Sequence, residues 1–183
     1  MRYRLRPLYQ LGGYLAAACL CFICALITAQ IIGRIIDRAA VALGGDRIGL
    51  AIPGLSEISG FLLVGASFLG LAYTFVHGGH IRVTLLIGRL PPAPRAFFEV
   101  FCLSIALALS LYLAWNLYWL LDDSITFNET SYGLLRIPLW IPQTGMLTGV
   151  VLFCLALIET WLHTLHIAVT RPTTFTIDDS GQE

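Results

Sequence analysis

The fold of this chain is decided by the stretch Leu8–Ile32, which reads LYQLGGYLAAACLCFICALITAQII and carries no Asp, Glu, Lys or Arg. About 20 apolar residues in a helix are enough to cross the roughly 30 Å hydrocarbon core of a bilayer. This stretch is longer than that, and it also exceeds the apolar region of an ordinary cleaved signal peptide. It therefore predicts a retained first membrane span.

Three further stretches lack charged residues over a comparable length. Because backbone polar groups in lipid must be satisfied within the segment, uncharged runs of this length are expected to be helices. We expect an all-α integral membrane protein with one domain over residues 1–172, followed by a disordered polar tail over 173–183. The four transmembrane helices are expected at about 8–32, 58–76, 97–121 and 137–161, with the first helix continuing as far as residue 43.

The composition of the 183 residues narrows the function classes. Hydrophobic residues make up 57% and charged residues 12%, and the mean hydropathy is +0.80, whereas soluble domains carry about 25% charged residues. The formal net charge is zero, so nucleic acid is not an expected partner. The loops are too short to form a separate soluble domain. We expect no enzyme, and the candidates are part of a transporter or channel, a membrane redox protein, or an assembly scaffold.

The arginines predict the orientation of the spans, since there is no Lys in the chain. Cytoplasmic loops of membrane proteins carry an excess of basic residues. More arginines lie in the N-terminal tail, the loop between spans 2 and 3 and the C-terminal tail than in loops 33–56 and 122–136. Both termini are therefore expected in the cytoplasm. Trp115, Trp119 and Trp140 at one side of the membrane, and Trp161 at the other, fit the aromatic belts of the two interfaces.

Small residues recur at helical spacing in all four spans. Ala66 and Gly70 lie in span 2, and Gly145 and Gly149 lie in span 4. Small residues let helices approach closely in lipid, where no hydrophobic force drives helices together. Two interpretations are open: the four helices pack on one another through these residues, or some of the residues face another protein.

Side chains that could carry chemistry are scarce. The span centres hold no charged residue, and a self-sufficient pump would need such groups at mid-depth. The histidines form two pairs with a spacing of three, which permits a bis-His haem or a metal site in a redox subunit. Polar aromatic rings at an interface need no cofactor to explain them, and none is expected. The pairs are His77 with His80 and His163 with His166.

Two charged residues stand at the entries to spans. Glu57 opens span 2, where it either interacts favourably with the helix dipole or pairs with an Arg of a partner protein. Arg136 directly precedes Ile137-Pro138-Leu139-Trp140, where its expected contact is either a lipid phosphate or a partner. The sequence leaves both pairs of alternatives open.

Two motifs carry a family resemblance. The first runs from Glu57 through Phe68-Leu69-Gly70-Leu71-Ala72-Tyr73 to Gly79-His80-Ile81-Arg82-Val83, and the second is Leu135-Arg136-Ile137-Pro138-Leu139-Trp140-Ile141-Pro142. Together they resemble the small membrane subunit of tripartite ATP-independent periplasmic (TRAP) transporters, the DctQ-like family. One position departs from the family pattern, because Thr84 stands where the family has an acidic residue after the valine.

The resemblance implies a subunit of a bacterial inner-membrane transporter rather than an enzyme, with no cofactor. Its partners would be a large membrane subunit, a periplasmic binding protein and membrane lipids. In this division of labour the large subunit carries sodium and the substrate, in sodium-dependent symport. The binding protein delivers an organic acid or similar solute, and the small subunit acts as a scaffold. The alternatives are a redox subunit that uses the His pairs, or a small self-assembling channel. The residues proposed for a subunit or lipid interface are Glu57, Gly70, Gly79, His80, Arg82, Arg136 and Trp140.

Overall fold

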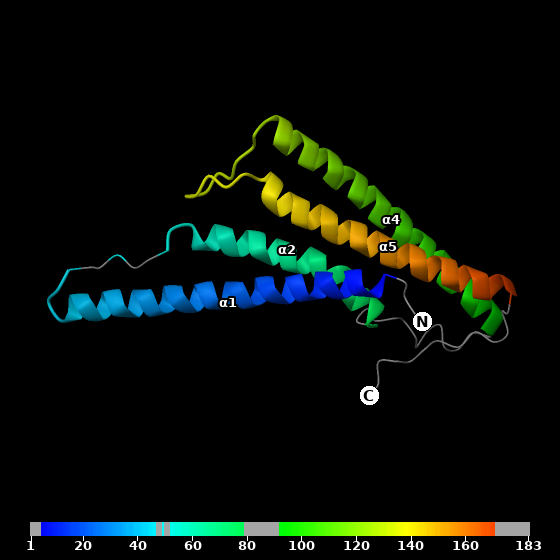
Figure 1. Ribbon diagram of the computed structural model, residues 1–183, viewed down its shortest axis with the longest axis horizontal. Helices are drawn as coiled ribbons and strands as arrows, with labels where there is room; N and C mark the ends of the chain where they lie inside the picture. The colour runs from blue at the N-terminus through cyan, green and yellow to red at the C-terminus, as the bar shows by residue number, and fades with distance from the viewer. Residues whose placement is uncertain (1–4, 47–48, 50–51, 79–91, 171–183) are drawn as a thin grey trace.

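The computed structural model describes residues 5–46, 49, 52–78 and 92–170, with no side chains described for 92–96. Within these ranges the chain forms four helices, each with a segment long and apolar enough to cross a membrane. The prediction of an all-α chain with four potential spans is confirmed, whereas the orientation of the termini stays a prediction. The helices, shown in Figure 1, are α1 (Arg6–Ala42), α2 (Leu55–Val76), α4 (Pro92–Thr126) and α5 (Trp140–Thr170).

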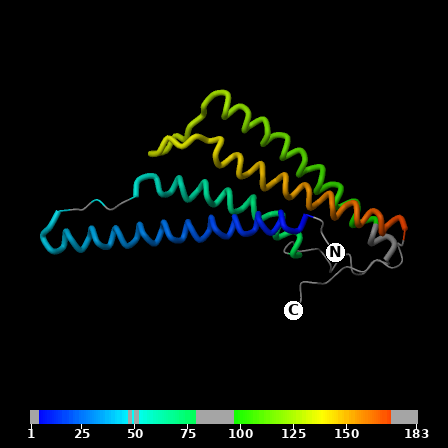
Figure 2. The backbone as a smooth tube through the Cα atoms, viewed as in Figure 1, coloured from blue at the N-terminus to red at the C-terminus, as the bar shows by residue number. Residues whose placement is uncertain are grey.

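The helices stand in a row whose spatial order is α1, α2, α5, α4. The extensive contacts join α1 to α2, α2 to α5 and α5 to α4, and the backbone trace of Figure 2 shows α4 on the far side of α5 from α1. A third of the apolar segment of α5 is buried, at 33%, against 11% for each of the other helices. The chain is therefore an open row with α5 in a central position, and most of its helical surface is left uncovered.

Glycines allow α2 to approach a neighbour on each flank. A Cβ atom on Gly149 of α5 would overlap the carbonyl group of Phe68 and lie 2.8 Å from the backbone nitrogen of Leu69. A Cβ atom on Gly12 of α1 would lie 2.8 Å from the carbonyl oxygen of Leu69. Because both obstacles are backbone atoms, neither site has room for a larger residue without a shift of the helices. Some of the small residues therefore mediate close packing between helices of this chain.

Two side-chain hydrogen bonds link helices near the end of the row where α1 starts and α5 finishes. The Tyr9 hydroxyl, which is fully buried, donates to Oε2 of Glu159 at 3.0 Å and joins α1 to α5. Nε1 of Trp161 donates to Oγ of Ser104 at 2.8 Å and joins α5 to α4. Trp161 therefore has a specific partner inside the protein, besides the interface position expected from the sequence.

The start of α5 differs from the expected one, whereas the end of α1 at Ala42 agrees with a first helix that continues to about residue 43. α5 begins at Trp140 rather than near residue 137, because the preceding residues form a hairpin-like loop with an antiparallel bridge between Thr130 and Pro138. The backbone nitrogen of Leu139 donates to the carbonyl oxygen of Glu129 at 3.0 Å in the same loop. α1 has 37 residues, or about 55 Å at 1.5 Å per residue. As Figure 1 shows, it extends well past the start of α2.

Candidate subunit and lipid interface

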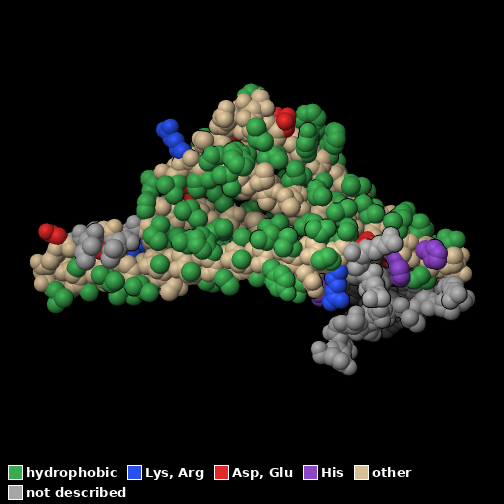
Figure 3. Space-filling view, viewed as in Figure 1, with side chains coloured by type: hydrophobic (Ala, Val, Ile, Leu, Met, Phe, Trp, Pro, Cys, Tyr) green, Lys and Arg blue, Asp and Glu red, His purple; other side chains and the backbone are tan. Residues whose placement is uncertain are grey.

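The visible face of the row is almost entirely apolar. Figure 3 shows hydrophobic side chains spread along the helices, with charged side chains gathered near the ends. Large side chains such as Leu15, Phe22 and Leu109 are about half exposed or more. Apolar surface of this extent is stable only against lipid or another protein, so the functional feature of the chain is a surface.

Polar side chains along the helices form hydrogen bonds within their own helix. Oγ1 of Thr74 donates to the carbonyl oxygen of Gly70 at 2.9 Å, and Nδ2 of Asn116 donates to that of Tyr112 at 2.8 Å. Side chains bonded in this way are compatible with lipid and do not line a polar path. The same pattern, a bond to the carbonyl four residues earlier, occurs at Thr28, Ser67, Ser104, Ser110, Thr148 and Thr160.

A groove of about 390 Å³ runs between α1 and α2. We call it the α1/α2 groove. Gly70 lies in it with space to spare, since a Cβ atom there would be 3.6 Å from Cβ of Ala16, an ordinary contact. The small residues around Gly70 predict close packing of helices, and the described side chains leave this groove unfilled. Its lining is formed mostly by small residues, namely Gly13, Ala16, Ala17, Ala66, Ser67 and Gly70, together with larger side chains.

Glu57 holds the α4–α5 loop, residues 127–139, against the first turn of α2. Oε2 of Glu57 accepts a hydrogen bond from the backbone nitrogen of Leu135 at 3.4 Å. The carboxylate lies so close to Gly133 that a Cβ atom on this glycine would be 2.6 Å from Oε1. The same Oε1 is buried, and no described residue forms a hydrogen bond with it. The position in the first turn favours the interaction with the helix dipole, and pairing with an Arg of a partner stays a prediction.

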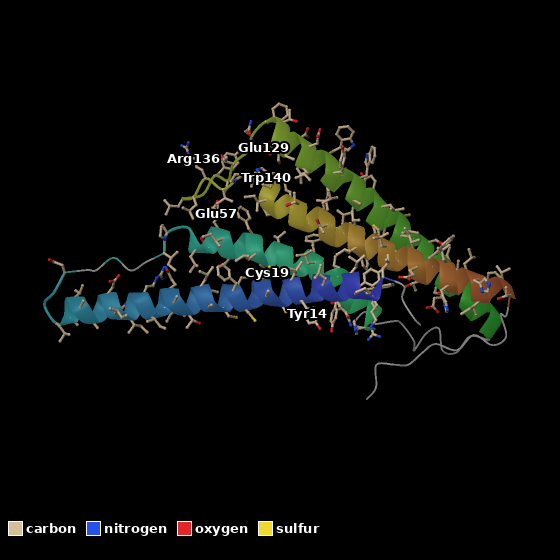
Figure 4. The ribbon with its side chains drawn as sticks, in the orientation of Figure 1. Tyr14, Cys19, Glu57, Glu129, Arg136 and Trp140 are labelled. Carbon is tan, nitrogen blue, oxygen red and sulfur yellow. The ribbon has the colours of Figure 1, made fainter. Side chains whose placement is uncertain are left out.

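The opposite side of the α4–α5 loop is exposed. Tyr132 and Leu134 project into the surroundings, and Trp140, at the start of α5, is 44% exposed. Figure 4 shows the Arg136 side chain directed away from the helices, while Glu57 lies beneath the loop. Two of the predicted interface residues therefore differ in their contacts. Glu57 contacts the loop of its own chain, whereas the Arg136 side chain is free to contact lipid or a partner protein.

A buried polar network beneath the loop was missed by the sequence reasoning. Oγ of Ser124 is fully buried, donates to Oε2 of Glu129 at 2.9 Å and accepts from Nε2 of Gln143 at 2.8 Å. The network links α4, the loop and α5, which are brought together only in three dimensions. The sequence contained one indication of this network, because Ser124 and Gln143 are polar residues at the ends of two apolar runs.

The histidines do not form a visible site. His77 ends α2, with Nδ1 2.9 Å from the carbonyl oxygen of Tyr73 and its ring stacked on the Tyr73 ring at a centroid distance of 4.1 Å. His163 and His166 are exposed on α5. Among the described residues, no group of three or more His, Cys, Asp or Glu could hold a metal ion. Gly79, His80 and Arg82 lie outside the described residues, so the pairing of His77 with His80 stays a prediction.

These features define a class: a multi-pass membrane protein whose helices form an open apolar row with surface left for lipid and partners. Residues 23–166 match the family described as "Tripartite ATP-independent periplasmic transporters, DctQ component". Because the match covers most of the chain, the protein belongs to the DctQ family, whose members are transporter subunits. The resemblance inferred from the sequence motifs is confirmed.

One curated protein of this family gives a more specific comparison. The chain is 23% identical over 118 residues to the "Ectoine TRAP transporter small permease protein TeaB" of Halomonas elongata. The matched region covers 62% of this chain and 61% of the relative, so the chain spans less than two thirds of the length of that protein. No solved structure matches the chain.

Proposed function

We propose that this protein is the small permease subunit of a TRAP-type transporter in the bacterial inner membrane. In this role it scaffolds a large membrane subunit, which carries sodium and the solute. A periplasmic binding protein delivers the solute, an organic acid or a similar compound. Membership of the DctQ family supports the proposal, and so does the shape of the row.

The observation that carries the scaffold role is the open order α1, α2, α5, α4. A transport path needs helices arranged around a lumen or a buried binding site, and a row of four helices encloses none by itself. Many hydroxyl groups along these helices, such as those of Thr28, Thr74 and Thr148, are bonded to their own backbone, so they offer little to a polar solute. Such a row is suited to extend the static part of a larger protein and to hold it in the bilayer.

The proposed orientation places both termini in the cytoplasm and the α4–α5 loop in the periplasm. There Tyr132, Leu134 and Arg136 would face the binding protein from a loop that the Ser124 network already holds in shape. Tyr and Arg are among the residue types that contribute most to protein interfaces, and a preorganised loop loses little entropy on binding. The loop thus supports a docking role in addition to the scaffold role.

Affinity purification of the tagged chain from native membranes in mild detergent, with mass spectrometry of the proteins that accompany it, tests the proposal. We expect a larger multi-span membrane protein at about equal stoichiometry. A chain that is purified alone, and that transports solute in liposomes, would establish the channel alternative. A haem Soret band in the purified material would establish the redox alternative with the His pairs.

A further inference from the structure

A second cavity, of about 470 Å³, lies between α1 and the start of α2. It differs from the α1/α2 groove because one of its walls is polar. Its size falls within the range of about 300–1,000 Å³ that is typical of small-ligand sites. The polar wall is formed by Gln30, Arg34, Ser56 and Ser59, and Ile27 and Ile31 contribute to the apolar wall.

Two side chains in the polar wall have hydrogen-bonding capacity that no described residue uses. Gln30 is only 7% exposed, and its Oε1 accepts from the backbone nitrogen of Ile52 at 2.7 Å. This bond fixes the orientation of the amide, and its nitrogen, Nε2, has no acceptor among the described residues. Oγ of Ser59 is also buried without a described hydrogen-bond partner. Buried polar groups of this kind normally have partners, so the cavity is built for a ligand with acceptor atoms.

Two further features favour a negatively charged ligand. Arg34 is among the residues that line the cavity and brings a positive charge to it, and none of the described lining residues is acidic. α2 begins there after Gly54, which supplies no capping side chain. The amide of Glu57 donates to the carbonyl oxygen of Gly54 at 3.1 Å, so the amides of Leu55 and Ser56 are the ones available to an anion. The nearest carboxylate on α2, that of Glu57, is engaged with the α4–α5 loop, and Asp37 on α1 has an interaction of its own.

The position of the cavity indicates that the ligand also has an apolar part. Ile27 and Ile31 are 42% and 53% exposed and precede Arg34 by about two turns and one turn of α1, respectively. The uncharged run of α1 ends just before Arg34, and α2 enters its own apolar stretch from the same level. An Arg above exposed isoleucines is the arrangement expected where hydrocarbon meets lipid headgroups.

We propose that this cavity binds the phosphate group of a membrane phospholipid. Arg34, Nε2 of Gln30, the hydroxyls of Ser56 and Ser59 and the first amides of α2 donate to the phosphate oxygens, while the acyl chains lie against Ile27 and Ile31. A phosphate offers several acceptor oxygens and a negative charge, which suits a wall made of donors. The site is independent of the proposed transport role, since it requires only that the chain lie in a membrane.

Photolabelling of the full-length chain in membranes, with whatever subunits remain bound to it, tests the proposal. Two probes with identical photoactivatable acyl chains are compared, a phosphatidylglycerol and a diacylglycerol that lacks the phosphate. We expect the phospholipid to label peptides that contain Ile27 and Ile31, and the diacylglycerol to label them about tenfold less, as for the loss of charge-assisted hydrogen bonds. Arg34→Ala should reduce the phospholipid label by a similar factor.

Two variants make the test specific. Arg38→Ala removes an exposed charge one turn further along α1, outside the cavity, and should leave the label unchanged. Ser59→Ala removes a single hydroxyl with little risk to folding and should reduce the label severalfold. Melting temperatures of all variants show whether each protein is folded.

Four results would overturn the proposal. Equal labelling by the two probes would mean that the cavity is only an apolar crevice. Removal of the label by millimolar inorganic phosphate would mean a site for free anions. Labelling unchanged in both Arg34→Ala and Ser59→Ala would exclude the named donors. Unchanged labelling in Arg34→Ala, together with lost capture of a periplasmic binding protein, would mean that Arg34 serves protein docking.

Discussion

α2 uses small residues in two different ways on its two flanks. Toward α5, Gly149 lies against the backbone of Phe68, and the neighbouring Val150 and Leu157 are buried. Toward α1, small residues around Gly70 line a groove that no described side chain fills. The same signal in the sequence thus marks a closed contact inside the chain and an open space on its surface. The comparison teaches that small residues indicate close approach without identifying what approaches.

Substitution at the closed contact should have the largest effect. Gly149→Ala places a methyl group on the backbone of Phe68, which cannot rotate away, so we expect destabilisation by about 2–3 kcal/mol. Reversible unfolding in SDS–detergent mixtures measures this. The matched control is Gly60→Ala on α2, where an added Cβ atom meets nothing within 4 Å and the change should stay within about 0.5 kcal/mol. Equal effects of the two substitutions would show that the closed contact is not tight.

The contact between Gly133 and Glu57 should be the next most sensitive. Gly133→Ala forces the carboxylate or the loop to move, and because a side chain can yield more easily than backbone we expect a cost of about 1–2 kcal/mol. In a Glu57→Ala background most of this cost should disappear. A double-mutant cycle measures the coupling, and a coupling near zero would mean that the carboxylate does not hold the loop.

The link from α1 across to α5 should contribute less. Tyr9→Phe removes the hydroxyl that donates to Glu159, and the expected loss of stability is about 1 kcal/mol. Tyr14→Phe, on the exposed side of the same helix, is the control. No difference between the two variants in SDS titration would show that this hydrogen bond does not stabilise the packing of α1 on α5.

Filling the open groove should have the smallest effect on the chain and a distinct effect on assembly. The groove has room for the side chain of Gly70→Leu, so we expect stability to change by less than about 0.5 kcal/mol. Recovery of the large membrane subunit on affinity purification should fall several-fold, whereas Gly70→Ala, which leaves most of the groove open, should keep it. Unchanged recovery with the Leu variant would mean that this groove faces lipid.

Most of the fold could be predicted because the hydrophobic pattern of membrane spans is local and strong. The run Leu8–Ile32 lies inside α1, and the other three runs each fall on one helix. The start of α5 was misplaced because Pro138 is well tolerated in a first helical turn. In the structure it belongs to a loop stabilised by bonds from Ser131 to Ile137 and from Leu139 to Glu129. The helix propensity of single residues does not predict such backbone hydrogen bonds within a loop.

The candidate surfaces were predicted less completely, because each depends on contacts between distant parts of the chain. Glu57 and Leu135 are 78 positions apart, and nothing in either motif indicates that a glycine would lie against the carboxylate. Gly12 and Gly13 both lie close to α2, but Gly12 meets the backbone of Leu69 and Gly13 meets the side chain of Tyr73, a difference that the sequence does not indicate. The sequence shows Gly70 in a stripe of small residues, but such a stripe does not predict whether a partner protein fills the groove.

The central position of α5 has a consequence for biogenesis. Among the described helices α5 is the last to be synthesised, yet it packs against both α2 and α4. α1 and α2 can pair as soon as both are in the bilayer, whereas α4 must wait for α5 before its main contact exists. Because many hydroxyl groups are hydrogen-bonded within their own helix, α4 can remain in lipid before α5 is present. A chain interrupted before Trp140 would leave α4 without its neighbour, so the row of described helices can form only after α5 has been synthesised.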